Sequence, residues 1–314
     1  MLITKIFITG GAGCIGSYLG DRLLAENEDN EVTIYDNLSS GKLGNLPNGV
    51  DFRKADLLDY VKLDYIMQLK KPDIVFHLAA NPDIRKGIDN TRLDLEQETI
   101  ATYNVLESMR LNKVKKIVFS SSSAIYGEAP TIPIPEYYGP LLPTSLYGAG
   151  KLACEGLISA YCHTFDMQAW ILRFANIVGD RATHGVIYDF IEKLKMNPDE
   201  LEILGDGSQE KTYLHVSDCI EGMLYVFGHS NDRVNVFNLG NFTTTNVTEI
   251  ATMLCKQMGI KPVFKYTGGG RGWVGDVPQV RFDVTKINLL GWHSKYNSTQ
   301  AVGKAIKEIV CKSL

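Results

Sequence analysis

The chain has 314 residues, of which 45% are apolar and 22% are charged, a composition typical of a globular protein with room for one large domain or two modest ones. A formal net charge of −4 argues against a nucleic-acid-binding protein, which needs a basic patch or stripe. No apolar run reaches membrane-spanning length and the six cysteines form no Cys-x-x-Cys pair, so we expect no membrane span, no metal site, and reduced thiols in the cytoplasm.

Strand-like apolar runs alternate with amphipathic segments through the first half of the chain. The runs lie at 3–9, 31–35, 73–78, 116–121 and 169–174, and the helix-like segments lie at 15–26, 63–70, 93–111 and 146–165. The first run leads directly into a glycine-rich motif, so we expect no signal peptide. The alternation predicts an α/β fold, a doubly wound parallel sheet of the Rossmann type with helices on both faces.

The pattern loosens after about residue 176. Short strands are expected at 201–204, 234–239 and 263–266, and helices at 186–195, 216–227, 247–258 and 299–310. We therefore predict a first domain over residues 1–175, which also takes parts of 210–240, and a smaller interleaved α/β domain over 176–314.

The glycine-rich motif has the context of a dinucleotide site, because Gly10, Gly13 and Gly16 follow a predicted strand and open a predicted helix. Glycines permit a tight turn and close backbone approach, and the start of the helix offers N–H groups to a pyrophosphate. Asp36 lies 20 residues beyond Gly16, where its carboxylate can bind ribose hydroxyls and would repel a 2′-phosphate. A turn role also explains an aspartate before Asn37, but the spacing favours the ribose contact, and NAD over NADP.

Asp56 and Leu57 follow a third strand-like segment. We expect them to hold the adenine edge of the cofactor. An N-cap of the next helix explains Asp56 nearly as well.

Tyr147 and Lys151 place a phenol and an ammonium one helical turn apart on the same helix face. A nearby cation favours the phenolate, so the pair predicts a tyrosine whose pKa is lowered toward neutral pH and which accepts a proton. A solvated surface pair is the alternative. The dinucleotide motif and a serine run 25 residues upstream of Tyr147 favour the catalytic interpretation.

Together these motifs resemble the extended short-chain dehydrogenase/reductase family, and within it the nucleotide-sugar 4-epimerases of the UDP-glucose 4-epimerase type. The resemblance covers nearly the whole chain and rests on Gly10-x-x-Gly13-x-x-Gly16, segment 36–41, His77-Leu78-Ala79-Ala80, segment 121–127, Tyr147-x-x-x-Lys151, segment 173–176 and segment 213–216.

The resemblance implies a role for each of a set of residues. The catalytic residues are Ser122, Tyr147 and Lys151. The residues expected to bind NAD are Gly10, Gly13, Cys14, Ile15, Gly16, Asp36, Asn37, Ser40, Gly41, Asp56, Leu57, Leu78, Ala79, Ala80, Ser120, Tyr147 and Lys151. The residues expected to bind the nucleotide-sugar substrate are Ser122, Tyr147, Asn176, Val186, Ile203, Lys211, Arg271 and Asp276. His77 and His215 are expected to be structural.

Several positions depart from the family pattern. Lys211 stands where many relatives have an arginine for the diphosphate, and lysine lacks the bidentate fork. Arg271 and Asp276 resemble an arginine/aspartate pair whose spacing is usually shorter, with Trp273 at the expected arginine position. Glu98 occupies the place of an asparagine near the cofactor.

The reaction expected from the resemblance is 4-epimerisation of a UDP-hexose through a transient 4-keto sugar. Related dehydratases and decarboxylases carry a carboxylate just after the catalytic serine, where this chain has Ser123 and Ala124. Val280 is small at a pocket position that is bulky in enzymes restricted to glucose and galactose, so N-acetylated substrates are a secondary expectation.

Two other functions stay open at this point: another nucleotide-sugar epimerase or 4-reductase, and a non-catalytic dinucleotide-sensing regulator. Relatives often dimerise through a four-helix bundle, which would use segments 93–111 and 146–165 and implies a homodimer. Ordinary core burial explains the same apolar faces.

Overall fold

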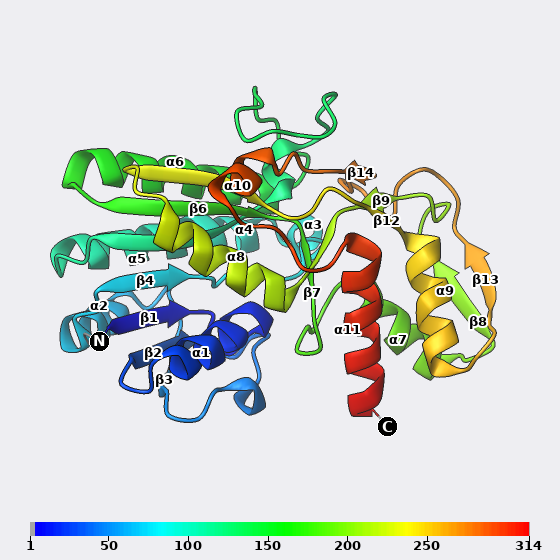
Figure 1. Ribbon diagram of the computed structural model, residues 1–314, viewed down its shortest axis with the longest axis horizontal. Helices are drawn as coiled ribbons and strands as arrows, with labels where there is room; N and C mark the ends of the chain where they lie inside the picture. Colours follow the sequence, from blue (N-terminus) through cyan, green and yellow to red (C-terminus); the bar gives the residue numbers. More distant parts are fainter. Residues whose placement is uncertain (1–3, 314) are drawn as a thin grey trace.

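The computed structural model describes residues 4–313, so residue 3 of the first predicted strand lies outside the described part. Its main feature is a seven-stranded sheet in the order β11-β6-β5-β4-β1-β2-β3, with every neighbouring pair parallel. The strands are β1 (Lys5–Thr9), β2 (Glu31–Asp36), β3 (Asp51–Lys54), β4 (Ile74–His77), β5 (Lys116–Ser122), β6 (Gln168–Phe174) and β11 (Val234–Leu239). The predicted doubly wound fold is confirmed (Figure 1).

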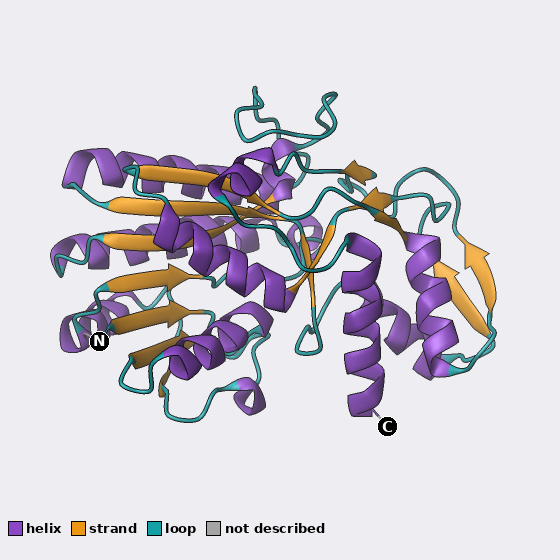
Figure 2. Ribbon diagram, viewed as in Figure 1, coloured by secondary structure: helices purple, strands orange, loops and turns teal. Residues whose placement is uncertain are grey.

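Helices cover both faces of this sheet (Figure 2). One face carries α1 (Cys14–Glu26) and α8 (Val216–His229), and the other carries α2 (Tyr60–Lys70), α5 (Ala101–Leu111) and α6 (Leu146–Phe165).

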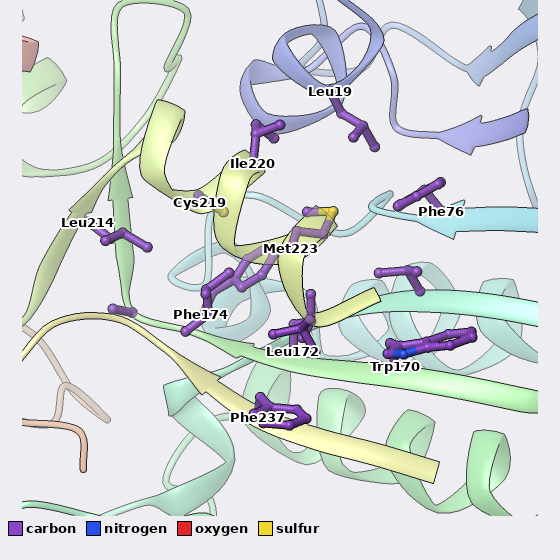
Figure 3. Packing of buried hydrophobic residues seen from close by; sticks show 14 of the residues in the cluster. Leu19, Phe76, Trp170, Leu172, Phe174, Leu214, Cys219, Ile220, Met223 and Phe237 are labelled. Atoms are coloured by element: carbon purple, nitrogen blue, oxygen red, sulfur yellow. The ribbon is translucent and has the colours of Figure 1, made fainter. Parts of the chain in front are cut away.

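The apolar strands are buried on both faces because successive side chains of a strand point to opposite sides. In β1, Ile6 and Ile8 belong to the core under α1 and α8, while Phe7 belongs to the core under α5 and α6. Figure 3 shows the first of these cores, where Met223 of α8 packs with residues of the sheet such as Leu172.

Two segments that follow residue 210 pack with elements that precede residue 175. Strand β11 pairs with β6 at the edge of the large sheet, and α8 lies against α1.

The helix predicted over 93–111 is interrupted. The structure has α3 (Lys86–Asp89), α4 (Thr91–Asp94), a π-helical segment over Leu95–Ile100, and then α5. The wider π turn departs from the 3.6-residue period on which the prediction relied. It carries Glu98, whose side chain is only 1% exposed.

A smaller domain lies beyond the carboxyl ends of the strands, toward which the strand arrows point in Figure 1. Its core is formed by α7 (Val186–Met196), α9 (Val247–Met258), α11 (Ser298–Ser313) and the parallel pair β8 (Glu200–Ile203) and β13 (Val263–Tyr266). The structure also has β7 (Asn176–Val178) paired with β10 (Tyr213–His215), and a small sheet of β9 (Glu210–Lys211), β12 (Thr245–Asn246) and β14 (Gln279–Val280). Helix α10 (Thr285–Leu290) packs on β11 and α8, and short 3₁₀ helices span Leu43–Asn45 and Ser123–Tyr126. Among the described helices, none is both long and apolar enough to cross a bilayer.

Candidate active site

A cavity of about 550 Å³ lies between the large sheet and the smaller domain. Its walls include residues that follow β1, β2, β4, β5 and β6, so it lies at the carboxyl ends of the parallel strands. The strand order reverses between β1 and β4, and ligands of open α/β sheets bind at such a switch point.

The glycine-rich turn between β1 and α1 leaves no room for a side chain at Gly10 or Gly16. Gly10 has φ +70°, and a Cβ added to it would lie 2.7 Å from the backbone nitrogen of Ala79. A Cβ on Gly16 would lie 2.4 Å from the carbonyl oxygen of Gly10. Helix α1 begins after Gly13 without a side-chain cap, so the positive end of the helix faces the cavity unshielded and fits a pyrophosphate.

Asp36 ends β2 in the cavity wall with its side chain buried. Its Oδ2 accepts a hydrogen bond from the Ala12 N–H at 3.0 Å, and its Oδ1 accepts one from the Leu38 N–H at 2.7 Å. A carboxylate has about four acceptor sites, so two remain for ribose hydroxyls. Together with the glycine turn, this arrangement fits NAD.

Most of the residues expected to bind NAD line the cavity. They are Gly10, Gly13, Cys14, Ile15, Gly16, Asp36, Asn37, Ser40, Leu57, Leu78, Ala79, Ala80, Ser120, Tyr147 and Lys151.

Gly41 and Asp56 are not in the cavity wall. Asp56 instead accepts hydrogen bonds from the side chain of Asn37 and from the N–H of Leu58, each at 2.9 Å. The N-cap alternative for Asp56 is wrong, because Asp59 caps α2 by accepting from the Lys62 N–H.

Ser122, Tyr147 and Lys151 lie in one wall of the cavity. Ser122 ends β5, and its hydroxyl accepts a hydrogen bond from the Ala124 N–H at 3.2 Å. Tyr147 and Lys151 stand in the first two turns of α6, which begins where the Ser145 hydroxyl caps the Gly148 N–H at 3.1 Å. The Lys151 Nζ lies 5.7 Å from the centre of the Tyr147 ring.

The pKa of Tyr147 differs from the expectation. Desolvation raises the pKa of this phenol above its ordinary value, whereas the Lys151 ammonium and a hydrogen bond from Ser122 act to lower it. The negative charge of Glu98 acts with desolvation. The sequence pair indicates the cation but neither the desolvation nor the nearby carboxylate, so the predicted lowering of the pKa is wrong for the protein alone.

The residues expected to bind substrate divide into two groups. Asn176, Val186, Lys211 and Asp276 line the cavity together with Ser122 and Tyr147. The Lys211 Nζ lies 2.5 Å from Asp276 Oδ1, so this ammonium and carboxylate form an ion pair in the wall.

Ile203 and Arg271 lie outside the cavity wall. Ile203 is fully buried in the core of the smaller domain, and its neighbour Leu204 lines the cavity instead. Arg271 is 46% exposed and donates to Glu128 Oε1 at 2.6 Å.

The polar residues of the cavity wall that were not predicted include Arg85, His184 and Asp189. Arg85 Nη1 lies 3.2 Å from Asp189 Oδ2, which joins the loop after β4 to the first turn of α7. A signal for Arg85 was available, because it follows the carboxyl end of a sheet strand.

His77 and His215 have the expected structural environments. His77 hydrogen-bonds Thr9 and Thr102 inside the core, and His215 hydrogen-bonds Ser217 and Glu308. Within residues 4–313 there is no group of three or more histidine, cysteine or acidic side chains placed to hold a metal ion.

Comparisons with known proteins agree with this geometry. Residues 6–240 match the model of the NAD dependent epimerase/dehydratase family. The UDP-glucose 4-epimerase of Mycolicibacterium smegmatis is 31% identical over an alignment of 316 positions. The alignment covers 96% of this chain and 97% of that protein.

Two solved structures are similar over nearly the whole chain. A UDP-galactose 4-epimerase has a TM-score of 0.88 and 38% identity, covering 98% of this chain and 99% of its own. The UDP-glucose 4-epimerase from Thermotoga maritima, solved with UDP-glucose, also has a TM-score of 0.88, with 31% identity over 98% of this chain and 99% of its own. The glycine turn, Asp36, Ser122, Tyr147 and Lys151 all lie in the wall of one cavity. The chain belongs to the NAD dependent epimerase/dehydratase family.

Proposed function

We propose that this protein is an NAD-dependent 4-epimerase of a UDP-hexose that interconverts UDP-glucose and UDP-galactose. The observation that carries the proposal is that one cavity contains two sets of residues. The glycine turn and Asp36, which form the cofactor cradle, line the same cavity as Ser122, Tyr147 and Lys151. The relatives and structures named above act on UDP-hexoses and support the same reaction.

In the first half of the reaction, Tyr147 accepts the proton of the sugar 4-hydroxyl, and Ser122 holds the same oxygen by donating a hydrogen bond. When bound, NAD would supply the acceptor for the C4 hydride and the source from which that hydride returns. Lys151 keeps its positive charge beside the phenol and offers N–H donors to the nicotinamide ribose. After the 4-keto sugar has turned over in the cavity, Tyr147 returns the proton, so neither protons nor electrons are gained over a cycle.

The wall beside Ser122 favours epimerisation over dehydration. Ser123 and Ala124 occupy the cavity wall directly after Ser122, and neither can act as the acid that an elimination of water needs.

The test is an NMR assay of the purified protein with UDP-glucose, together with a measurement of bound NAD. We expect UDP-galactose to form without net oxidation of added NADH. Stoichiometric NADH oxidation would instead identify a 4-reductase, and a protein that binds NAD without converting any UDP-hexose would be a regulator.

We further propose that N-acetylated substrates are accepted, because Val280 is a small residue in the cavity wall. The wild-type protein should turn over UDP-N-acetylglucosamine, and Val280→Tyr should reduce that turnover far more than turnover of UDP-glucose. Equal losses with both substrates would remove this part of the proposal.

We also propose a cytoplasmic homodimer. The π-helical segment and α5 expose apolar side chains that a second copy could cover: Leu95, Ile100, Tyr103 and Leu111. Light scattering after gel filtration should give twice the mass of the chain, and Tyr103→Glu should lower it. A monomeric wild-type protein would contradict the proposal.

A further inference from the structure

Glu98 is a buried carboxylate that contacts Lys151 and has no role of its own in the proposed reaction. Its Oε2 lies 2.9 Å from the Nζ of Lys151, and both side chains are only 1% exposed. Glu98 itself is absent from the cavity wall, whereas Lys151 lines it. The carboxylate therefore lies behind the lysine as seen from the substrate.

The fold holds Glu98 in this place by several contacts. Glu98 Oε1 accepts a hydrogen bond from the Asn81 N–H at 2.8 Å, and the Cys154 thiol donates to the Glu98 carbonyl oxygen at 3.3 Å. Helix α6 has a glycine where it passes this side chain, because a Cβ on Gly150 would lie 2.9 Å from the Glu98 Cβ. The π-helical segment that carries Glu98 completes the arrangement, and such segments occur frequently at functional sites.

The ion pair affects the charge of Lys151. Burial is the largest single effect and acts to lower the pKa of this ammonium, but Glu98, Tyr147 and Cys154 together outweigh burial and raise the pKa above its ordinary value. Burial raises the pKa of Glu98, and the ammonium at 2.9 Å opposes that effect. The Lys151 Nζ keeps this ion pair while its side chain also lines the cavity wall.

The same ion pair affects Tyr147. A lone buried ammonium beside a phenol stabilises the phenolate strongly, but a carboxylate in contact with that ammonium cancels part of its field. Other titratable groups face the pair from the elements around it: Tyr147 and Cys154 on α6, Asp94 on α4 and His77 on β4.

One of these neighbours carries no charge at working pH, and another, Asp94, acts on the pKa of Tyr147 in the same direction as Glu98. Desolvation lowers the pKa of His77 to about 3, so its ring is neutral at working pH. Desolvation raises the pKa of the Asp94 carboxyl group, and the Asp94 Oδ2 has no hydrogen-bond partner among the described residues.

From these contacts we propose that Glu98 is a positioning residue of the reaction, which anchors the Lys151 ammonium and partly cancels its charge at Tyr147. The proposal rests on the proposed function for its meaning. The phenol then stays protonated in the resting protein and releases its proton to solvent only when a further positive charge lies in the cavity. After that single release, Tyr147 takes one proton from the sugar and returns it in each cycle, so turnover itself exchanges no proton with solvent.

The test compares wild-type holoenzyme with the isosteric variant Glu98→Gln by following the ultraviolet absorbance of tyrosinate against pH. The chain has 15 tyrosines, so the titration of Tyr147→Phe is subtracted to isolate one phenol. We expect the Tyr147 midpoint in Glu98→Gln to fall by about one pH unit or more. The acid limb of the kcat profile should move in the same direction by a similar amount.

Glu155→Gln is the matched control, because it removes a buried carboxylate of α6 that pairs with Arg173 at 2.8 Å rather than with Lys151. It should leave the Tyr147 midpoint unchanged. Glu98→Asp keeps the charge but draws it back by one methylene, so its midpoint should fall by less.

An unchanged or higher midpoint in whichever Glu98 variant folds would overturn the proposal. An unchanged midpoint would mean that Glu98 carries no charge at Tyr147, and a higher one that it serves only to keep Lys151 charged. The titration needs no turnover, so a protein that fails to epimerise UDP-glucose can still show the shift, and the two proposals fail separately.

Discussion

Gly10→Ala should disrupt the cofactor cradle by a backbone clash. The φ of +70° at this position costs a residue with a Cβ about 1–2 kcal/mol. The new Cβ would also lie 2.7 and 2.8 Å from the backbone N and Cα of Ala79, and overpacking of this kind costs about 1–3 kcal/mol. The sum is about 2–5 kcal/mol of unfolding free energy. Because the obstacle is backbone rather than a flexible side chain, relief requires the turn to move away from the end of β4, which opens the cradle.

Urea denaturation and the NAD content of the purified protein measure the two effects. Gly49→Ala is the matched control, since Gly49 also has a positive φ, +89°, but nothing within 4 Å of an added Cβ. The unfolding free energy of Gly49→Ala should fall only by the cost of a positive φ, and this variant should keep its bound NAD. Gly303→Ala, in α11 with open space around the Cβ, should stabilise the protein slightly. The reasoning is refuted if Gly10→Ala loses no more stability than Gly49→Ala and retains bound NAD.

Three further predictions concern the buried polar groups. Tyr147→Phe should reduce kcat for UDP-glucose by at least ~10²-fold while NAD content stays near wild type, and a variant with wild-type kcat would exclude Tyr147 as the base. Lys151→Met leaves Glu98 buried and unpaired, so the unfolding free energy at neutral pH should fall by about 3–5 kcal/mol in denaturant titrations; a loss below 1 kcal/mol, roughly that of an exposed pair, would show that the ion pair is not desolvated. Burial lowers the pKa of His77 from 6.5 to about 3, so the unfolded chain binds a proton that the native protein does not. His77 should therefore contribute its full stability above pH 6.5 and lose about 1.4 kcal/mol per pH unit as the pH falls toward 3, and His77→Gln should show a shallower decline.

The sequence predicted the large elements because their signals are local. Strands such as β1 and β5 are continuous apolar runs, and α6 and α9 show helical periodicity between polar caps. Strands β7, β9, β10, β12 and β14 have two or three residues each, too few for any period to appear. Their pairing depends on contacts between segments far apart in the chain.

The site was predictable where the chemistry is carried by a motif. The glycine turn, Asp36, and the Tyr147 and Lys151 pair all lie in the cavity wall. The contact between Glu98 and Lys151 was not predictable, because it depends on the π-helical segment and on the glycine that lets Glu98 approach α6. The direction of the Tyr147 pKa was missed for the same reason, since desolvation and a second charge come from the assembled cavity rather than from the helix.

The most direct test of the central claim follows the hydrogen on C4 of the sugar. UDP-glucose carrying deuterium at C4 is incubated with the purified holoenzyme, and the UDP-galactose formed is analysed by NMR and mass spectrometry. If the hydride passes to NAD and back within one closed cavity, the product retains deuterium at C4 and takes up no hydrogen from water. Loss of the label to solvent, or UDP-galactose formed at the wild-type rate by Tyr147→Phe, would contradict the account.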